Sequence, residues 1–154
     1  MEFNFKGQIA IVTGGTRGIG RGISEAFLKA GARIVATYQS NEKAAEEFIE
    51  ANKKYSDYLD LRSFDVTQYS EVEDFYRYVE QAYGEFQILV HGSGIRIDSI
   101  VGMMHESDWR KVIDTNLTGT FSMCKLAVQN MMRKKYGRII IITSPVGKFG
   151  FLGQ

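Results

Sequence analysis

Four glycines gather in one short segment near the N-terminus, with a spacing that would let the backbone wrap around a phosphate. The segment Thr13–Gly20 reads TGGTRGIG, and it follows the apolar run Ile9–Val12 and precedes an amphipathic stretch. A strand, a glycine-rich turn and a helix in this order direct free N–H groups at a bound anion, which the helix dipole also favours. Gly14 would permit the tight turn, Gly18 would let the backbone approach a pyrophosphate, and Gly20 would let the helix pack on the strand. The segment therefore predicts a dinucleotide site, with a plain turn before a helix as the alternative.

The residues after the second apolar run bear on which dinucleotide would bind. NAD sites usually place a carboxylate about 20 residues beyond the glycines, where it binds the ribose 2′-hydroxyl. Here the run ends in Tyr38–Asn41, with no acid before Glu42, while Arg17 could pair with a 2′-phosphate. The missing acid and the present arginine favour NADP, although Arg17 could also be a solvated loop residue. The candidate cofactor-binding residues of this part of the chain are Gly14, Thr16, Arg17, Gly18, Ile19, Gly20 and Ser40.

Apolar runs and helix-like segments alternate along the whole chain, and these elements would position the candidate residues. Short runs rich in β-branched residues suit strands that are buried on both faces. The alternation predicts one α/β domain over residues 1–154, a doubly wound parallel sheet with right-handed crossovers and helices on both sides. The expected strands are Gln8–Thr13, Arg33–Thr37, Tyr58–Phe64, Phe86–His91 and Arg138–Thr143. The expected helices are Gly18–Ala30, Asn41–Lys54, Thr67–Tyr83 and a long region, Ser107–Lys135, that bends near Asn116.

Residues near the ends of these helices carry capping signals. Thr67 is expected to cap the helix that follows it. Gly31, Gly84 and Gly137 each come just after a helix, where a left-handed residue is favoured, so each is expected to end one. Pro145 is the only proline, and it falls just past the last expected strand.

Four motifs, in order along the chain, resemble those of the classical short-chain dehydrogenase/reductase family. The turn Thr13–Gly20 is similar to its TGxxxGxG form, and Asp65-Val66 is similar to its adenine-contacting pair. The segment Asp114–Gly119 is similar to its internal asparagine motif, and Gly137–Ser144 is similar to the strand that ends in its catalytic serine. The resemblance covers essentially the whole chain. It implies a Rossmann-type sheet of strand order 3-2-1-4-5 that lacks the family's C-terminal strands.

Segments Tyr38–Glu42 and Trp109–Phe121 carry a narrower resemblance, to 3-oxoacyl-[acyl-carrier-protein] reductases. This implies NADPH-dependent reduction of a 3-oxoacyl thioester, free or carrier-bound, or of a related carbonyl, to the alcohol. By resemblance Ser144 would hydrogen-bond the substrate carbonyl, and Asn116 would hold a water in a proton relay. The alternatives are a strand-end serine that satisfies a turn and a solvent-facing asparagine. The further cofactor-binding residues that the resemblance implies are Asp65, Val66, Gly92 and Gly94.

Two departures from the family pattern affect the expected site. The family usually has Asn-Asn-Ala-Gly after the fourth strand, where this chain has His91-Gly92-Ser93-Gly94. The two glycines keep a backbone that can approach the cofactor. His91 is interpreted as a satisfied core histidine, with a substitute hydrogen bond for the missing amides as the alternative. The family's catalytic Tyr-x-x-x-Lys would fall beyond Gln154. Because that tyrosine is the family's proton donor, the chain by itself is expected to lack reductase activity.

Composition narrows the expected partners and location. The formal net charge of +1 predicts neither nucleic-acid binding nor attachment to an anionic membrane, and no apolar stretch is long enough to span a bilayer. The single cysteine, Cys124, cannot form an internal disulfide and is expected in the core or an interface, which fits a reducing cytoplasm. No cluster of residues suggests a metal site.

The long helical region holds more apolar residues than one core-facing stripe requires, which favours association into a homo-oligomer. The run Ile139–Ile142 is expected to form an uncovered, β-branched sheet edge. Two alternatives to a working reductase stay open: an inactive nucleotide-binding fragment and an oligomerisation module. The apolar residues that suggest association are Phe121, Met123, Leu126, Ala127, Val128, Met131 and Met132.

Overall fold

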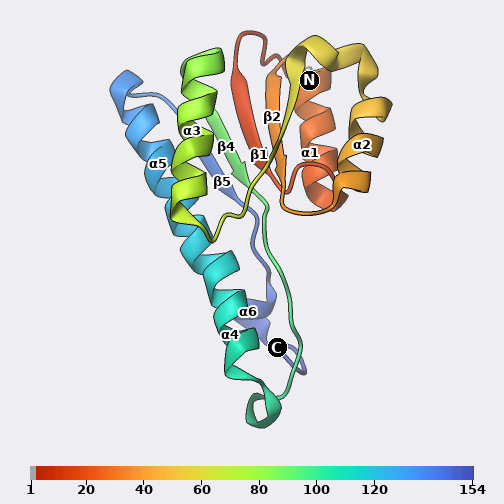
Figure 1. Ribbon diagram of the computed structural model, residues 1–154, viewed down its shortest axis with the longest axis vertical. Coiled ribbons are helices and arrows are strands. Elements are labelled where there is room, and N and C mark those ends of the chain that lie inside the picture. The colour runs from red at the N-terminus through yellow and green to blue at the C-terminus, as the bar shows by residue number, and fades with distance from the viewer. Residues whose placement is uncertain (1–2) are drawn as a thin grey trace.

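The computed structural model describes residues 3–154, and these form one five-stranded sheet with helices on both faces (Figure 1). All four strand pairings are parallel, and the order is β3-β2-β1-β4-β5, as predicted. The order reverses between β1 and β4, and doubly wound sheets bind their ligands at such a point. The strands are β1 (Ile9–Thr13), β2 (Arg33–Tyr38), β3 (Leu59–Ser63), β4 (Ile88–His91) and β5 (Arg138–Ile141).

Two layers of helices enclose the sheet (Figure 1). Helices α1 and α2 pack on one face, whereas α3 and α5 pack on the other. Helix α4 continues into α5 through a π-helical turn, Asp114–Thr118, at the position where a bend was expected. The described helices are α1 (Gly18–Lys29), α2 (Glu42–Ala51), α3 (Tyr69–Tyr83), α4 (Glu106–Ile113), α5 (Gly119–Lys134) and α6 (Val146–Phe149), with 3₁₀ segments at Lys53–Tyr58 and Val101–Met103.

Alternation along the strands divides the core into two apolar clusters. In β1, Ala10 and Val12 join the cluster beneath α1 and α2, whereas Ile9 and Ile11 join the cluster beneath α3 and α5. Full burial of such a side chain stabilises the fold by about 1.5–3 kcal/mol. Because β1 is buried along its whole length, its carboxyl end at Thr13 is held firmly where the glycine turn begins.

The start of α3 differs from the prediction. Its N-cap residue is Gln68, so the expectation that Thr67 caps this helix was wrong. The Thr67 N–H donates instead to the Asp65 carboxylate at 2.9 Å, which closes a turn just before the helix. Aspartate side chains commonly accept such local backbone hydrogen bonds, and they compete in this way with helix capping.

The end of α5 also differs from the prediction. Its C-cap residue is Lys135, in the left-handed region at φ 54°, so Gly137 does not end the helix. The Met131 side chain packs so closely on Gly137 that no larger residue fits there, because a Cβ atom at position 137 would lie 2.2 Å from the sulfur of Met131. Gly31 and Gly84 have the positive φ expected of residues that end a helix.

Apolar residues of α5 divide between two surfaces. One set is buried against the sheet, and Cys124 packs half-buried at its border, in agreement with the core or interface position expected for it. The other set is exposed to solvent on the described chain. The buried set is Met123, Ala127 and Met131, and the exposed set is Phe121, Val128 and Met132.

Strand β5 forms one edge of the sheet within residues 3–154. The side chains of Ile140 and Ile141, and of Ile142 just beyond the strand, are 46%, 47% and 39% exposed. This arrangement agrees with the β-branched edge expected from the sequence. Such an edge pairs readily with other extended chain.

A candidate dinucleotide site at the carboxyl ends of the strands

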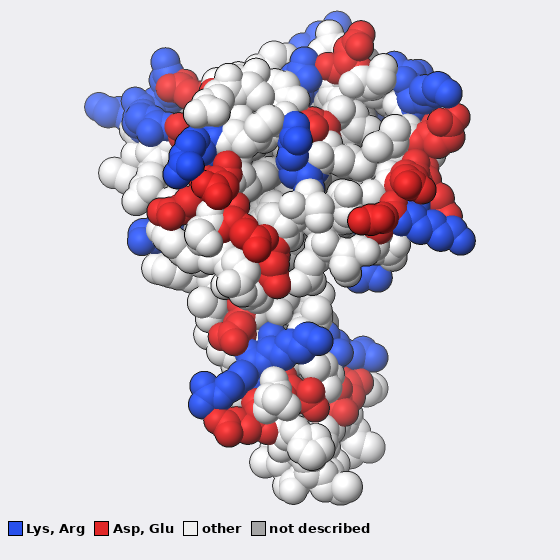
Figure 2. Space-filling view, in the orientation of Figure 1, with Lys and Arg blue, Asp and Glu red and all other residues white. Residues whose placement is uncertain are grey.

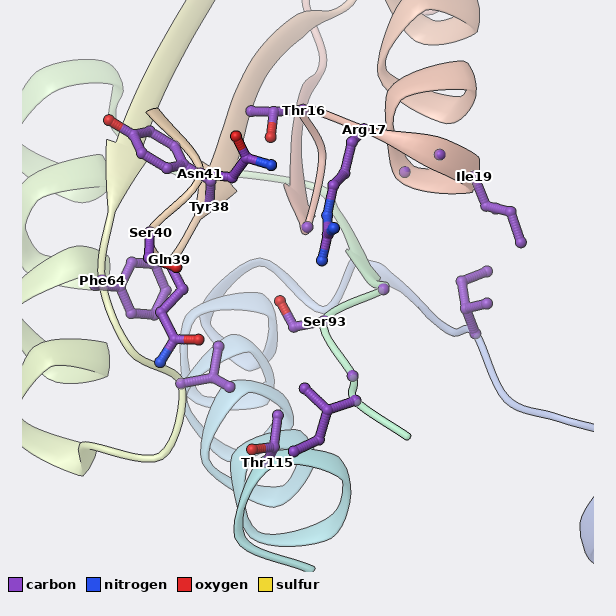
Figure 3. A pocket seen from close by; sticks show the side chains of 18 residues that line it. Thr16, Arg17, Ile19, Tyr38, Gln39, Ser40, Asn41, Phe64, Ser93 and Thr115 are labelled. Carbon is purple, nitrogen blue, oxygen red and sulfur yellow. The ribbon is translucent and has the colours of Figure 1, made fainter. Parts of the chain in front are cut away.

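A cavity of about 430 Å³ opens at the carboxyl ends of the strands (Figure 3). Its walls come from the glycine turn after β1, the segments after β2 and β3, the loop after β4 and the π-helical turn. Asp65, Asn116 and Ser144 do not line it, although all three were expected at the site. The expected residues that do line it are Gly14, Thr16, Arg17, Gly18, Ile19, Gly20, Ser40, Val66, Gly92 and Gly94.

The glycine turn has the backbone geometry that its motif predicts. Gly14 has φ +64°, a conformation that other residues rarely adopt, and a Cβ on Gly20 would lie 2.1 Å from the Gly14 carbonyl oxygen. A Cβ on Gly18 would meet nothing within 4 Å, so this part of the turn faces open space. No side chain caps the start of α1. The first N–H groups of this helix are therefore available to an anion.

Arg17 supplies the positive charge of the site. It is the N-cap residue of α1, its side chain is exposed, and its guanidinium group points into the cavity (Figure 3). Across the described residues no carboxylate lines the cavity, and the segment Tyr38–Asn41 after β2 contributes hydroxyl and amide groups. The lining thus favours an anionic ligand. Elsewhere, on the face shown in Figure 2, basic and acidic side chains are intermixed.

The loop after β4 is attached to the end of β1 through the Thr13 side chain. Thr13 Oγ1 accepts hydrogen bonds from the Gly92 N–H at 3.0 Å and the Ser93 N–H at 3.1 Å. A Cβ on Gly14 would lie 3.3 Å from the Gly92 carbonyl oxygen, so the turn and the loop are in close contact. Two walls of the cavity are therefore joined at this point.

Ser93 lines the cavity, and sequence reasoning missed it. Its hydroxyl group points into the cavity from the loop after β4 (Figure 3). The signal was present in the sequence, because Ser93 stands between Gly92 and Gly94, which were both expected at the cofactor. A hydroxyl group here can donate one hydrogen bond to a ligand and accept others.

His91 lies at the end of β4 and is buried, with 1% of its surface exposed. Its Nδ1 atom lies 2.9 Å from Thr13 Oγ1, and its Nε2 atom has no hydrogen-bond partner among the described residues. Burial lowers the pKa of His91 to about 4, so the ring is neutral at pH 7. The structure thus agrees with a core position for His91 and with one hydrogen bond from its ring, but the ring is not fully satisfied, because Nε2 has no partner among the described residues.

Asn116 joins the π-helical turn to the loop after β4. Its Oδ1 accepts the Ile95 N–H at 2.8 Å, and its Nδ2 donates to the Ile95 carbonyl oxygen at 2.8 Å. Gly94 leaves room for this pair, because a Cβ there would lie 3.3 Å from Asn116 Oδ1. A widened helical turn is often found at functional positions. Here the turn carries the asparagine toward the loop.

Asp65 is engaged within the protein. Its Oδ2 accepts a hydrogen bond from Gln39 Nε2 at 2.7 Å, and its Oδ1 accepts the Thr67 N–H. These bonds connect the segments after β2 and β3, which both border the cavity. Asp65 therefore holds the wall that Val66 lines.

Ser144 lies beyond β5, in an exposed turn on the carboxyl side of the sheet. Its Oγ accepts the Val146 N–H at 3.2 Å, as expected of a serine that satisfies a turn. That bond leaves the hydroxyl hydrogen free to donate elsewhere. Ile142, two residues earlier, does line the cavity, so Ser144 lies close to its border in sequence.

Residues 3–154 show neither a metal-binding cluster nor a membrane-spanning helix. They contain no group of three histidine, cysteine or acidic side chains arranged to hold a metal ion. No helix within the same residues has the length and apolar composition needed to cross a membrane.

The parallel sheet, its strand order and the glycine turn define a Rossmann-type α/β fold. The sequence matches the short chain dehydrogenase family over residues 8–154. The chain therefore belongs to the short-chain dehydrogenase family.

Two curated reductases and one solved structure show how similar the chain is to individual members of this family. The chain is 37% identical to the 3-oxoacyl-[acyl-carrier-protein] reductase of Escherichia coli over 153 residues, which cover 98% of this chain and 60% of that protein. It is 36% identical to the reductase of the same name from Vibrio harveyi, with the same coverage. The crystal structure of gox2181 superposes with a TM-score of 0.90 at 30% identity, over 96% of this chain and 58% of that one. The chain thus spans about 60% of the length of these curated relatives.

Proposed function

We propose that this chain binds NADPH and forms the cofactor-binding part of a reductase that converts a 3-oxoacyl thioester to the alcohol. The observation that carries the proposal is the cavity beside the glycine turn, into which Arg17 points and which no carboxylate lines among the described residues. A carboxylate at the end of β2 would favour the 2′-hydroxyl of NAD, whereas an arginine accommodates the 2′-phosphate of NADP.

The residues present fit the phosphates of a dinucleotide. The uncapped start of α1 presents N–H groups, and the space beside Gly18 admits a close approach of the pyrophosphate. Arg17 would pair with the 2′-phosphate, and Ser40 and the loop Gly92–Gly94 would border the sugars. When bound, the nicotinamide would supply a hydride to the substrate carbonyl.

Ser144 would orient that carbonyl. Its hydroxyl hydrogen is free to donate to a carbonyl oxygen, because only its oxygen is engaged, by the Val146 N–H. Asn116 would support a proton relay: each polar atom of its amide makes one bond to Ile95, which leaves one lone pair and one N–H for a water. A thioester on an acyl carrier is the favoured substrate class, and the names of the relatives support it.

A second candidate function is nucleotide binding without turnover. No tyrosine in the sequence is followed four residues later by a lysine. In the family such a pair supplies the proton donor and the residue that lowers its pKa, and general acid catalysis contributes about 10²–10⁴-fold to a rate. The 154-residue chain by itself is therefore expected to bind the cofactor and to turn over poorly.

Two measurements on the 154-residue chain test these proposals. Titration calorimetry should show NADPH binding about 10-fold or more tightly than NADH. Equal or tighter NADH binding would overturn the cofactor assignment. NADPH oxidation with an acetoacetyl thioester should be negligible, and robust turnover would instead place the proton donor within these residues.

A further inference from the structure

The hydroxyl group of Thr13 has three polar partners at the end of β1. Its Oγ1 accepts the backbone N–H groups of Gly92 and Ser93, at 3.0 and 3.1 Å. The third partner is Nδ1 of His91, 2.9 Å away. Both Thr13 and His91 are buried, so bulk water does not compete for these positions.

The number of donors and acceptors determines the direction of the third hydrogen bond. A hydroxyl group has two lone pairs and one hydrogen, and the two backbone N–H groups occupy both lone pairs. The Gly92 N–H also contacts the Thr13 carbonyl oxygen at 3.2 Å, and its bond to Oγ1 is the shorter of the two. The hydrogen of Thr13 must therefore point at His91, so that Nδ1 accepts and the ring hydrogen lies on Nε2. In the other tautomer three donors would converge on one oxygen that has only two lone pairs. Nε2 has no partner among the described residues in either tautomer, so it does not distinguish between them.

Two further observations agree with this arrangement. Burial lowers the pKa of His91 to about 4, so the ring is neutral at pH 7 and one of its two nitrogens can accept a hydrogen bond. In the parallel pairing of β1 with β4, His91 stands directly opposite Thr13, so the strands themselves set the distance between the two side chains. The contact joins residues 78 positions apart in the sequence.

Thr13 connects two walls of the cavity, because it precedes the glycine turn and holds the loop after β4. We propose that His91 is a positioning residue for cofactor binding: as the Nε2–H tautomer it accepts the Thr13 hydrogen and so directs both Thr13 lone pairs at Gly92 and Ser93. This role rests on the proposed function, because the position of the loop affects affinity only if the cavity takes a dinucleotide.

The tautomer is tested first, in the ligand-free chain, by ¹⁵N NMR of its two histidine rings, with His105→Gln to assign the signals. The expected result is a hydrogen on Nε2 of His91 and an accepting Nδ1. Thr13→Val removes the hydroxyl group and should shift the Nδ1 resonance. A hydrogen on Nδ1 overturns the proposal. The outcome does not depend on whether the chain binds a cofactor.

Binding is tested with two variants of similar size. His91→Asn keeps an acceptor, Oδ1, at the position of Nδ1, whereas His91→Leu has none. His91→Leu should weaken NADPH binding about 3- to 10-fold, as for the loss of one buried hydrogen bond, and should speed exchange of the Ser93 amide hydrogen. His91→Asn should restore both properties to within about 2-fold of the unmodified chain.

Equal affinity and equal Ser93 exchange in His91→Leu and the unmodified chain overturn the proposal. If His91→Leu does not fold, His91→Phe takes its place, because it keeps a planar ring in the core and also lacks an acceptor. An unmodified chain that binds no dinucleotide overturns the proposed function. In that case Ser93 amide exchange still decides whether His91 orders the loop.

Discussion

The side-chain amide of Asn116 and the backbone of Ile95 form a reciprocal pair of hydrogen bonds, each 2.8 Å long. Asn116 lies in a π-helical turn between α4 and α5, and Ile95 follows the loop that borders the cavity. The pair attaches this loop to the longest helical segment of the described chain. The loop is thus held at one end by Thr13 and at the other by Asn116.

Asn116→Ala is expected to lower the free energy of unfolding by about 1 kcal/mol. Two exposed hydrogen bonds are lost at roughly 0.5–1.5 kcal/mol each, and part of this is offset by the higher helix propensity of alanine. Urea denaturation measures the change. Gln129→Ala, at an exposed site of α5, serves as the control and should change stability by less than about 0.5 kcal/mol. Equal effects of the two substitutions would contradict a role of the Asn116 pair.

Arg17→Ala is expected to remove most of the preference for NADPH over NADH. A charged contact to phosphate is worth about 1.5–3 kcal/mol, which corresponds to roughly 10- to 150-fold in affinity. Titration calorimetry with both cofactors measures the preference. Lys29→Ala makes the same charge change at the far end of α1 and should leave the preference unchanged. A preserved preference in Arg17→Ala would assign the discrimination to other residues.

Ser93→Ala is expected to weaken NADPH binding about 2- to 10-fold, because it removes a hydroxyl group that points into the cavity. The thermal midpoint should stay the same, since the backbone N–H of residue 93 still donates to Thr13. Ser70→Ala, at an exposed site in α3, is the control. Unchanged NADPH affinity in Ser93→Ala would show that the hydroxyl group makes no contact with the cofactor.

Acid is expected to destabilise the fold through His91. Its pKa is about 4 in the folded chain and about 6.5 when exposed, so below pH 6.5 the unfolded state binds the proton first. The free energy of unfolding should therefore fall as the pH is lowered, with a His91 contribution of about 2 kcal/mol between pH 7 and pH 4.5.

Urea denaturation at the two pH values measures this contribution. His91→Asn should lose less stability on acidification than the unmodified chain, whereas His105→Gln, at an exposed site, should behave like the unmodified chain. Carboxylates titrate alike in all three proteins, so their effects cancel in the comparison. The same acid sensitivity in His91→Asn would contradict the lowered pKa.

Association is expected through the exposed side of α5. Phe121, Val128 and Met132 recur at helical spacing and are 61%, 41% and 69% exposed. Light scattering at micromolar concentration should show a dimer or larger species, because burial of apolar surface drives association. Met132→Glu should shift the equilibrium toward monomer, whereas Gln129→Glu should not. A monomeric, folded chain would contradict this expectation.

Sequence patterns predicted the framework of this protein because its determinants are local. β-Branched runs marked four of the five strands, all except β3, and the alternation of strand-like and helix-like segments predicted a parallel sheet. The resemblance to the family supplied the strand order, which proved correct. The glycine turn was also predictable, since the positive φ of Gly14 and the tight contact at Gly20 arise from a few adjacent residues.

Tertiary structure decided how those elements are connected around the cavity. Asn116 pairs with Ile95, and the Thr13 hydroxyl group accepts the N–H of Gly92. Each partner lies outside the local pattern from which a helix end or a loop is predicted. Hydrogen bonds such as that between Thr13 and His91 depend on which residues the parallel register places opposite each other, and only the folded sheet sets that register.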